Sequence, residues 1–462
     1  MQHIIDNIPT AVLSNEKKKI LLEALETNQA NYSVRLNPAK ISAAINLNRV
    51  DWCKNAFYID SKPRFSMDPL WHAGAYYVQE AGSMFLDTVI RALPFNHTPT
   101  HALDMCAAPG GKTLLMADAL PEECVVVANE ILPVRFKSLH ENIIKWGNCN
   151  IITTNNAPAQ FESLEAYFDL VLVDAPCSGE GLLRRHDEAL NQWSPKLIEE
   201  CAFRQKEILA SSLECLKPGG FLIYSTCTFN TLENEENIKW LIEEKNCLPV
   251  DLDLTLSPQI TLTETCGNKA YRFFPGITQS EGFFITVVQK PTTHSAKHWS
   301  AKSIKLKQVA NPVKEIIDFN VKCTVTEEKN GLKFYTQQVL EGLAHLSERL
   351  KVMDAGRDFG VVKNGKFIPS ETLGFATCIN VSDDFMTAVN YDEAVAFLSR
   401  ADFKLNHQKR GYNFIVYENV RLGLVNLLEN RINNYYPNHW RILNPDKSQK
   451  YSLSNAVSDP LQ

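Results

Sequence analysis

Short apolar segments alternate with amphipathic segments from residue 101 to residue 290, and this alternation constrains the fold more than any other feature of the chain. The apolar segments have the length of strands and lie at residues 101–105, 124–129, 150–154, 168–174, 220–225 and 282–288. The segments between them have the apolar periodicity of helices and lie at residues 112–120, 133–146, 195–216 and 230–244. This order predicts an α/β fold with a doubly wound, mostly parallel sheet. The Lys-Pro-Gly-Gly turn at 217–220 is expected to separate the third helix from the fifth strand.

The chain has 462 residues, too many for one hydrophobic core, so we expect several domains. Residues 291–310 are polar, rich in lysine and aperiodic, which is typical of a linker. Outside the alternating region, helices are expected at 17–27 and 392–400, and strands at 32–37, 414–417 and 422–425. The predicted domains are a small α/β lead-in at 1–95, the alternating domain at 96–290, the linker at 291–310, an intermediate domain at 311–380 and an α+β domain at 381–462.

Composition indicates a cytoplasmic protein. No apolar stretch approaches the roughly 20 residues of a membrane span, and the N-terminus lacks the basic start and apolar centre of a signal peptide. The 12 cysteines show no spacing typical of zinc ligands, so we expect no metal site. Four of them lie in apolar contexts and are expected to be small buried thiols: Cys124, Cys201, Cys215 and Cys378.

Two further cysteines each follow a predicted strand. Cys177 lies in the run V-D-A-P-C-S-G and Cys227 in the run Y-S-T-C-T. The carboxyl ends of parallel strands meet at one rim, where open α/β sheets bind their ligands. Two thiols and the carboxylate of Asp174 at this rim indicate covalent chemistry on an electrophilic carbon. Reactivity alone leaves open which thiol attacks, because a positively polarised rim activates either one.

A loop of small residues follows the first strand of the alternating domain and opens a helix. After Asp104 and Met105 it contains Cys106, Ala107, Ala108, Pro109, Gly110, Gly111 and Lys112. The glycines and the free N–H groups of the helix N-terminus fit a nucleotide or adenosine cofactor. Glu130 ends the second strand, where it is placed to bind ribose hydroxyls or, alternatively, to cap the next helix. A P-loop is the competing interpretation, although Cys106 stands where its first glycine should be.

Three motifs in this order resemble the Nop2/Sun family of RNA 5-methylcytosine methyltransferases. They are D-M-C-A-A-P-G-G-K at 104–112, D-A-P-C-S-G-E-G at 174–181 and S-T-C-T at 225–228. Flanking matches are Y-Y-V-Q-E-A at 76–81, R-F-F-P at 272–275 and E-G-F-F at 281–284. The resemblance extends to the PUA-like domain of the bacterial RsmF branch through G-K-F-I-P-S at 365–370, L-G at 422–423 and N-R-I-N-N-Y-Y-P at 430–437.

The resemblance implies a Rossmann-like class I methyltransferase domain that uses S-adenosyl-L-methionine. It implies that Cys227 attacks carbon 6 of cytosine and that Cys177 assists release of the covalent adduct. Asp174 is the expected partner of the cytosine N3 and, with the 106–112 loop and Glu130, borders the cofactor. The family usually has an aspartate after its third strand; Asn156 stands near that position here and is expected to contact the adenine.

RsmF-type enzymes methylate a cytosine in 16S rRNA, so 16S rRNA or the small ribosomal subunit is the expected partner of a monomeric enzyme. The target base must be unstacked or flipped, and the lead-in and PUA-like domains are expected to bind flanking RNA. Arg184 and Arg185 are candidate phosphate contacts or, alternatively, surface arginines. Trp440 and Arg441 are candidate RNA contacts, with a core position as the alternative for the tryptophan.

The formal net charge of −6 argues against binding RNA by charge alone, so any basic face must be local. Two clusters are candidates for such a face or for ordinary solvated side chains: Lys297, Lys302, Lys305, Lys307 and Lys314, and Arg421, Arg431, Arg441, Lys447 and Lys450. Two other functions remain open, a tRNA cytosine-5 methyltransferase and a non-catalytic RNA-binding factor of ribosome assembly. Intact thiols, Asp174 and the glycine loop argue against the second.

Overall fold

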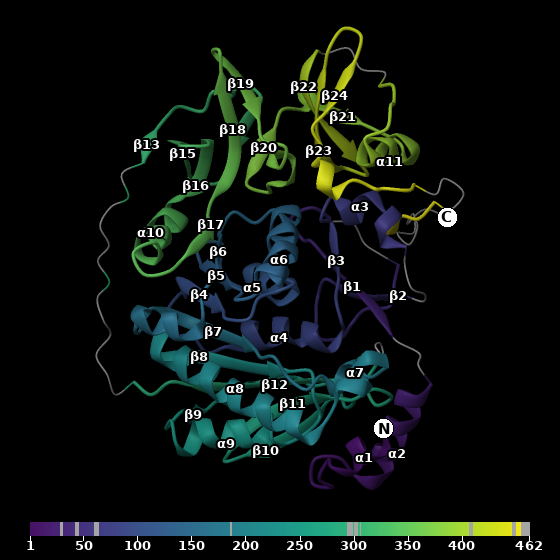
Figure 1. The fold of residues 1–462 in the computed structure, drawn as a ribbon, viewed down its shortest axis with the longest axis vertical. Helices are drawn as coiled ribbons and strands as arrows, with labels where there is room; N and C mark the ends of the chain where they lie inside the picture. Colours follow the sequence, from purple (N-terminus) through teal and green to yellow (C-terminus); the bar gives the residue numbers. More distant parts are fainter. Residues whose placement is uncertain are drawn as a thin grey trace.

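A ten-stranded sheet lies at the centre of the computed structural model (Figure 1). The structure describes residues 1–27, 31–41, 46–59, 64–184, 187–292, 299, 304, 306–405, 410–445 and 450–453. The strand order is β10-β11-β12-β8-β7-β4-β5-β6-β17, and β9 (Leu248–Pro249) pairs with the end of β12. The parallel strands are β4 (His101–Asp104), β5 (Val125–Asn129), β6 (Ile151–Thr154), β7 (Phe168–Asp174) and β8 (Leu216–Thr226). The antiparallel strands are β10 (Thr261–Thr265), β11 (Asn268–Phe273), β12 (Phe283–Gln289) and β17 (Val352–Asp354).

Helices cover both faces of this sheet because its central strands are apolar on both sides. One face packs against α4 (Phe85–Ala92), α5 (Gly111–Ala119) and α6 (Pro133–Trp146). The other packs against the 3-10 segment η3 (Pro158–Leu164) and helices α8 (Pro195–Cys215), α9 (Glu235–Glu243) and α10 (Gln337–Leu346). Along β5, Val126 belongs to the first core and Val127 to the second, as the two-residue period of a strand requires. The predicted α/β fold is confirmed, but the sheet is mixed and not mostly parallel, because β12 with its neighbours β9, β10 and β11 and the edge strand β17 run antiparallel.

In the central domain, two predicted boundaries differ from the structure by several residues. Strand β8 begins at Leu216, directly after α8, so the turn at 217–220 lies inside the strand as an irregularity. Leu216 pairs with Phe168, and the pairing resumes where Phe221 meets Leu170. Helix α9 begins at Glu235 and not at residue 230, because the side chains of Asn230 and Asn234 bind Ser178 Oγ and the Thr228 carbonyl, in the loops that carry the two thiols.

The N-terminal region has its own small sheet. Its elements are α1 (Gln2–Asp6), α2 (Asn15–Glu26), β1 (Tyr32–Leu36), β2 (Ala56–Ile59), η1 (Phe65–Met67), α3 (Pro69–His72), β3 (Tyr76–Val78) and η2 (Gly82–Met84), with strand order β2-β1-β3. Helix α4 falls inside the predicted lead-in, yet Val89 and Ile90 are buried in the core of the central sheet. This helix therefore packs as part of the central domain.

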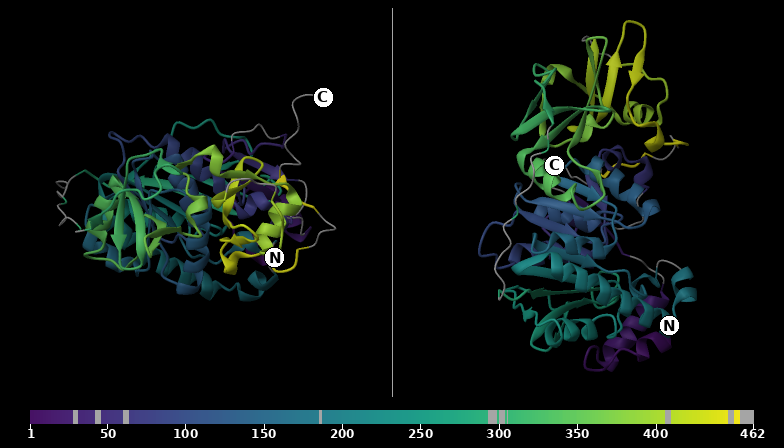
Figure 2. Two further views of the ribbon diagram at one scale, coloured as in Figure 1. Left: turned by 90° about the horizontal axis from the view of Figure 1, so that it is seen from above. Right: turned by 60° about the vertical axis from the view of Figure 1, so that its left-hand side comes forward.

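The C-terminal region forms three further sheets at one end of the molecule, with α1 and α2 at the other end (Figures 1 and 2). The first sheet contains β13 (Lys307–Gln308), β15 (Cys323–Glu328), β16 (Gly331–Thr336), β18 (Arg357–Lys363) and β19 (Lys366–Pro369), and a separate pair joins β14 (Ile317–Phe319) to β20 (Ile379–Val381). The last sheet contains β21 (Met386–Ala388), β22 (Gly411–Tyr417), β23 (Val420–Leu427) and β24 (Ile432–Asn434), beside α11 (Tyr391–Ser399). The short segments here are η5 (Leu373–Phe375), η6 (Asp383–Phe385) and η7 (Asn438–Trp440).

The regions are not independent of one another. Strand β17 leaves the intermediate region and becomes the edge strand of the central sheet beside β6. The N-terminal sheet and the last module share one core, in which Trp440 and Tyr436 pack with Val34 and Leu70. The core interpretation of Trp440 is thereby confirmed. Among the described residues, no helix is both long and apolar enough to cross a membrane.

Candidate active site

The loop between β4 and α5 is held by its neighbours. Ala107 N donates to the Asn129 carbonyl (2.8 Å), and Asn142 Nδ2 donates to the Pro109 carbonyl (2.8 Å). Gly110 has φ +114°, a conformation that strains any residue with a side chain. A Cβ atom on Gly111 would lie 2.9 Å from the Tyr77 ring. Backbone conformation thus explains the first glycine, and the packing of α5 against Tyr77 explains the second.

A cavity of about 510 Å³ opens beside this loop. Its lining includes Cys106 and Glu130, and the remaining residues are mostly apolar: Met105, Ile131, Leu132, Ala157, Pro158, Ala159, Pro176 and Ile208 among them. Glu130 Oε1 accepts from Leu132 N (2.8 Å), and Oε2 lies 3.6 Å from an Arg135 guanidinium nitrogen. The Glu130 carboxylate therefore holds the backbone of Leu132, the residue before α6, and also lies on the cavity wall.

Asp104 is buried at the end of β4 with one oxygen unpaired. Oδ2 accepts from Thr113 Oγ1 (2.6 Å), whereas Oδ1 has no hydrogen-bond partner within the described residues. Burial raises the pKa of this carboxyl to about 7. A buried acceptor without a donor is unfavourable unless a ligand supplies one. The base of the loop is therefore suited to a ligand that carries a hydrogen-bond donor.

Cys177 and Cys227 meet at the carboxyl ends of β7 and β8. Their sulfur atoms are 3.2 Å apart, and Cys227 N lies 3.4 Å from Cys177 Sγ. The hydrogen bond with Cys227, together with burial, raises the pKa of Cys177 well above its ordinary value. Cys177 therefore keeps its proton more readily than an ordinary thiol, and its S–H can donate to the Cys227 sulfur.

Asp174 is held beside the thiols by two donors. Lys112 Nζ donates to Oδ2 (2.8 Å), and Ser225 Oγ donates to Oδ1 (2.8 Å). Burial opposes the charge of Lys112, but Asp174, and more weakly Cys227, hold the pKa of Lys112 above its ordinary value. A P-loop lysine reaches the phosphates that the loop cradles. Because Lys112 binds Asp174 instead, the geometry disfavours the P-loop interpretation.

A buried carboxylate that the sequence pattern does not identify, that of Glu180, lies in the same motif as Cys177. Its Oε2 accepts from Thr228 Oγ1 (2.7 Å), Phe229 N (2.7 Å) and Asn230 N (2.9 Å), the three residues that follow Cys227. Its Oε1 accepts from Trp193 Nε1 (2.9 Å). Glu180 belongs to η4 (Glu180–Leu182), so it ties the Cys177 loop directly to the Cys227 loop.

Glu233 makes a second tie. Its carboxylate accepts from Ser178 N (3.0 Å), Gln205 Nε2 (2.7 Å) and Asn230 Nδ2 (2.7 Å), and it has no exposed surface. Burial raises the pKa of Glu233, against the effect of these donors. The sequence signals for these two residues are the glutamate of the S-G-E-G motif and the first glutamate of the L-E-N-E run. Their hydrogen-bond partners can be identified only in the folded structure, where the two loops lie together.

Several expected RNA contacts lie elsewhere. Arg184 is buried, and its guanidinium donates to Glu281 Oε2 (2.9 Å) and the Ser280 carbonyl (3.1 Å), so it is not a phosphate contact. Arg421 donates to three backbone carbonyls, those of Gly374, Ala376 and Ile379, which removes it from a basic face. Arg441 is exposed. Five further candidates lie outside the described residues: Arg185, Lys297, Lys302, Lys305 and Lys447.

Both polar groups of the Asn156 side chain bind the main chain of Lys351. Oδ1 accepts from Lys351 N (2.9 Å) and Nδ2 donates to Lys351 O (3.1 Å). The expected contact with the adenine stays a prediction. The backbone N–H of Asn156 donates to Asn129 Oδ1 (3.0 Å). Asn156 is buried between β5 and the start of the edge strand β17, and both hydrogen-bonding groups of its side chain are in use.

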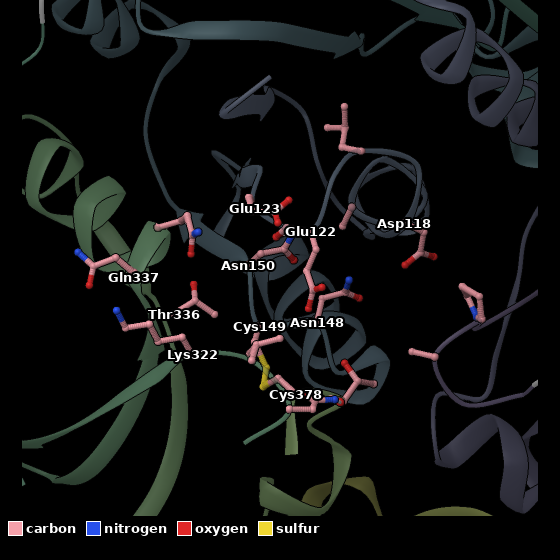
Figure 3. A pocket seen from close by; sticks show the side chains of 18 residues that line it. Asp118, Glu122, Glu123, Asn148, Cys149, Asn150, Lys322, Thr336, Gln337 and Cys378 are labelled. Carbon is pink, nitrogen blue, oxygen red and sulfur yellow. Dashed lines mark hydrogen bonds between the residues drawn. A yellow bond between two sulfur atoms is a disulfide. The ribbon is translucent and has the colours of Figure 1, made fainter. Parts of the chain in front are cut away.

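Cys378, expected to be a free thiol, forms a disulfide with Cys149, whereas Cys124, Cys201 and Cys215 are free and buried. Figure 3 shows the disulfide on the wall of a second cavity, of about 710 Å³, with Asp118 and Glu122 on one side and Lys322 on the other. No residue predicted to be catalytic or cofactor-binding lines this cavity. Within the described ranges, no group of three or more His, Cys, Asp or Glu side chains is arranged to hold a metal ion.

The strand order, the glycine loop and the cavity at the carboxyl rim define a Rossmann-like methyltransferase fold. Three family models match successive parts of the chain. The 16S rRNA methyltransferase RsmB/F model matches residues 93–289, the N-terminal domain of 16S rRNA methyltransferase RsmF matches 7–81, and the methyltransferase RsmF PUA domain matches 386–442. The chain therefore belongs to the RsmB/F family of methyltransferases.

Individual relatives agree with this membership. Ribosomal RNA small subunit methyltransferase F of Shewanella piezotolerans is 28% identical over 91% of this chain and 93% of its own length. The protein of the same name from Shigella flexneri serotype 5b is 36% identical over 56% of this chain, and in that match the chain spans 57% of the relative's length. The crystal structure of NSun6 from Pyrococcus horikoshii with SFG has a TM-score of 0.51 at 19% identity, over 63% of this chain and 97% of that one. At this identity the likeness supports the fold.

Proposed function

We propose that this chain transfers a methyl group from S-adenosyl-L-methionine to carbon 5 of a cytosine in 16S rRNA. The observation that carries the proposal is the pair of thiols, Cys177 and Cys227, 3.2 Å apart beside Asp174. Pro176, next to Cys177 in the chain, lines the cavity beside the glycine loop, so thiol chemistry and a cofactor would meet there. Relatives named as small-subunit rRNA methyltransferases support this choice of substrate.

The cavity fits the proposed cofactor. Glu130, on the cavity wall, would bind the ribose. The unpaired Asp104 Oδ1, at the base of the adjoining loop, would accept a hydrogen bond from the ammonium group of the methionine part. The apolar wall formed by Ile131, Leu132 and Pro158 suits the adenine. When bound, S-adenosyl-L-methionine supplies an electrophilic methyl group. The crystal structure of NSun6 from Pyrococcus horikoshii contains SFG, which is in line with a small-molecule site in this fold.

Cys227 begins the reaction by adding its thiolate to carbon 6 of the cytosine. The 5,6 double bond opens, N3 takes a proton from the carboxyl group of Asp174, and carbon 5 becomes nucleophilic enough to take the methyl group. The carbon 5 proton then passes to a base, the 5,6 double bond re-forms, the bond between carbon 6 and Cys227 breaks, and N3 returns its proton to Asp174. Cys177, the protonated thiol of the pair, assists this release by donating a hydrogen bond to the departing sulfur.

A transfer assay tests the proposal. The full chain is incubated with methyl-labelled S-adenosyl-L-methionine and, in separate reactions, small ribosomal subunits, naked 16S rRNA and tRNA. Label is expected at cytosine 5 in 16S rRNA, presented naked or in the subunit. Label in tRNA alone would establish the tRNA alternative. RNA binding without transfer to any of the three would contradict the proposed activity and favour the assembly factor.

A further inference from the structure

We infer that Asn156 is a positioning residue through which the C-terminal region supports the cofactor cavity. The inference rests on the proposed function in one respect, the identity of the cofactor. It assigns to Asn156 a task different from contact with the adenine, and it makes the segment that begins at Lys351 a structural part of the cofactor site.

The first half of the link is a two-way hydrogen bond between a side chain and a main chain. Asn156 Oδ1 accepts from Lys351 N (2.9 Å), and Asn156 Nδ2 donates to Lys351 O (3.1 Å). The backbone N–H of Asn155 also donates to Lys351 O (3.1 Å). The pairing of β6 with β17 continues this contact, with Thr154 opposite Val352. The Asn156 side chain thus extends the sheet edge beyond the end of β6.

The second half of the link leads to the cavity. Asn129 and Asn156 exchange hydrogen bonds, Asn156 N to Asn129 Oδ1 and Asn129 Nδ2 to Asn156 O, both at 3.0 Å. Asn155 Nδ2 donates to the carbonyl of Glu130 (2.7 Å). Asn129 and Glu130 line the cavity, and so do the three residues that directly follow Asn156. A displacement of Asn156 would therefore move one wall of the cavity.

The partner groups explain why an amide is needed at this position. Lys351 presents one donor and one acceptor, and only a side chain with both can satisfy them in a site where Asn156 is 2% exposed. An aspartate would place a carboxylate oxygen against Lys351 O, so that two acceptors face each other without a proton. The asparagine at this position, where the family usually has an aspartate, thus supplies the acceptor and the donor that the main chain of Lys351 requires just before the edge strand β17.

The segment after Lys351 is itself firmly anchored. Asp354, at the end of β17, accepts from His140 Nε2 (3.0 Å) and from Lys333 Nζ (2.5 Å). His140 lies on α6 and Lys333 on β16, so the anchor joins the central domain to the C-terminal sheet. This anchor consequently holds the main chain of Lys351, the hydrogen-bond partner of Asn156, in place.

Binding of S-adenosyl-L-methionine to the full chain, measured by calorimetry, tests the inference together with hydrogen exchange. Asn156→Asp is expected to weaken affinity about tenfold or more, because a buried hydrogen bond is replaced by a repulsive contact. Amide exchange at 351–354 is expected to become faster in the same variant. Lys351→Ala is the matched control, since its main chain is retained and only the exposed bond from Nζ to Asn155 Oδ1 is lost. This control should keep both readouts close to those of the wild type.

A carboxylate that accepts from the adenine amino group would give the opposite result. Unchanged or tighter binding by Asn156→Asp would overturn the inference, and so would weaker binding with unchanged exchange at 351–354. If Asn156→Asp does not fold, Asn156→Ala removes both hydrogen bonds without adding charge, and its exchange at 351–354 must still rise. Failure of the wild-type protein to bind S-adenosyl-L-methionine would refute the proposed cofactor, while the exchange measurements would still decide whether Asn156 holds the edge strand.

Discussion

Asp104 and Asp169 are buried carboxylates at opposite ends of neighbouring strands, and their surroundings differ. Asp169, at the start of β7, accepts from Lys217 Nζ and His97 Nε2 (both 2.8 Å) and from two backbone amides, those of Thr100 and His101. Burial opposes its charge, but these donors lower the pKa of Asp169 to about 2. Asp104, at the end of β4, keeps one oxygen without a partner in the described structure, and burial raises its pKa to about 7.

The difference separates the two rims of the sheet. At the amino rim, Asp169 is satisfied by the protein itself and serves stability. At the carboxyl rim, Asp104 is left with an acceptor for a ligand, while the neighbouring loops are fixed by fully paired carboxylates such as Glu180. We therefore expect substitutions at the amino rim to affect folding alone, and substitutions at the carboxyl rim to affect the proposed methyl transfer.

The largest expected effect at the carboxyl rim comes from Cys227→Ala. Loss of the attacking thiol should lower methyl transfer to 16S rRNA by at least about a thousandfold. Affinity for S-adenosyl-L-methionine should be nearly unchanged, because the cavity is intact. Asp169→Asn, at the amino rim, should retain near wild-type turnover per folded molecule in the same assay. Substantial transfer by Cys227→Ala would refute the role assigned to that thiol.

Cys177→Ala should separate formation of the adduct from its release. Cys227 still attacks, but the hydrogen bond to the departing sulfur is gone, so turnover should fall about a hundredfold. A protein–RNA adduct that survives denaturing gel electrophoresis should accumulate when RNA and S-adenosyl-L-methionine are both present. If no adduct is detected while turnover is lost, Cys177 acts before release and the proposed division of labour is wrong.

Glu180→Gln should disturb the thiols without touching them. Every contact of Glu180 is a donor, so the amide of glutamine must face either Trp193 Nε1–H or the N–H groups that follow Cys227. We expect trapping of RNA that contains 5-fluorocytidine to slow by about tenfold. Asp169→Asn provides the comparison, because it removes a similarly buried acceptor and should lower the melting temperature without slowing the trapping. Equal trapping rates in both variants would mean that Glu180 serves stability alone.

The dependence of stability on pH also separates the two carboxylates. Folding raises the pKa of Asp104 to about 7. The contribution of this carboxyl group to the free energy of unfolding is therefore complete below its pKa in the unfolded chain, near 4, and is lost as pH rises toward 7. Folding lowers the pKa of Asp169 to about 2, so its contribution is present above pH 4 and is lost as pH falls. The difference in free energy of unfolding between Asp104→Asn and the wild type, measured with urea, should therefore shift in favour of the variant by on the order of 1–3 kcal/mol between about pH 4 and 7. Parallel curves for the two proteins would contradict the shift assigned to Asp104.

The alternation of segments was sufficient to predict the central sheet, because each strand and helix carries its own periodicity. The two cysteines could be placed at one rim for the same reason. The hydrogen-bond network that supports the two cysteines could not be predicted, because the role of Glu180 depends on backbone N–H groups about 50 positions away. Strand β17 has only three residues, too few for a pattern to be visible. Arg184 follows a motif in a polar run, and only the position of Glu281, 97 residues later, shows it to be buried.

The core shared by the N-terminal sheet and the last module has a consequence for synthesis. Asp68 accepts a hydrogen bond from the amide of Leu453, which leaves the ribosome 385 residues later. At about 5–20 residues per second, that interval lasts about 20–80 s. For most of it, Val34, Leu70 and their neighbours lack the C-terminal aromatic side chains, such as Tyr436 and Trp440, that will cover them. A nascent chain must therefore keep these residues from associating with other chains, and a product truncated before Tyr436 would expose them to chaperones and proteases.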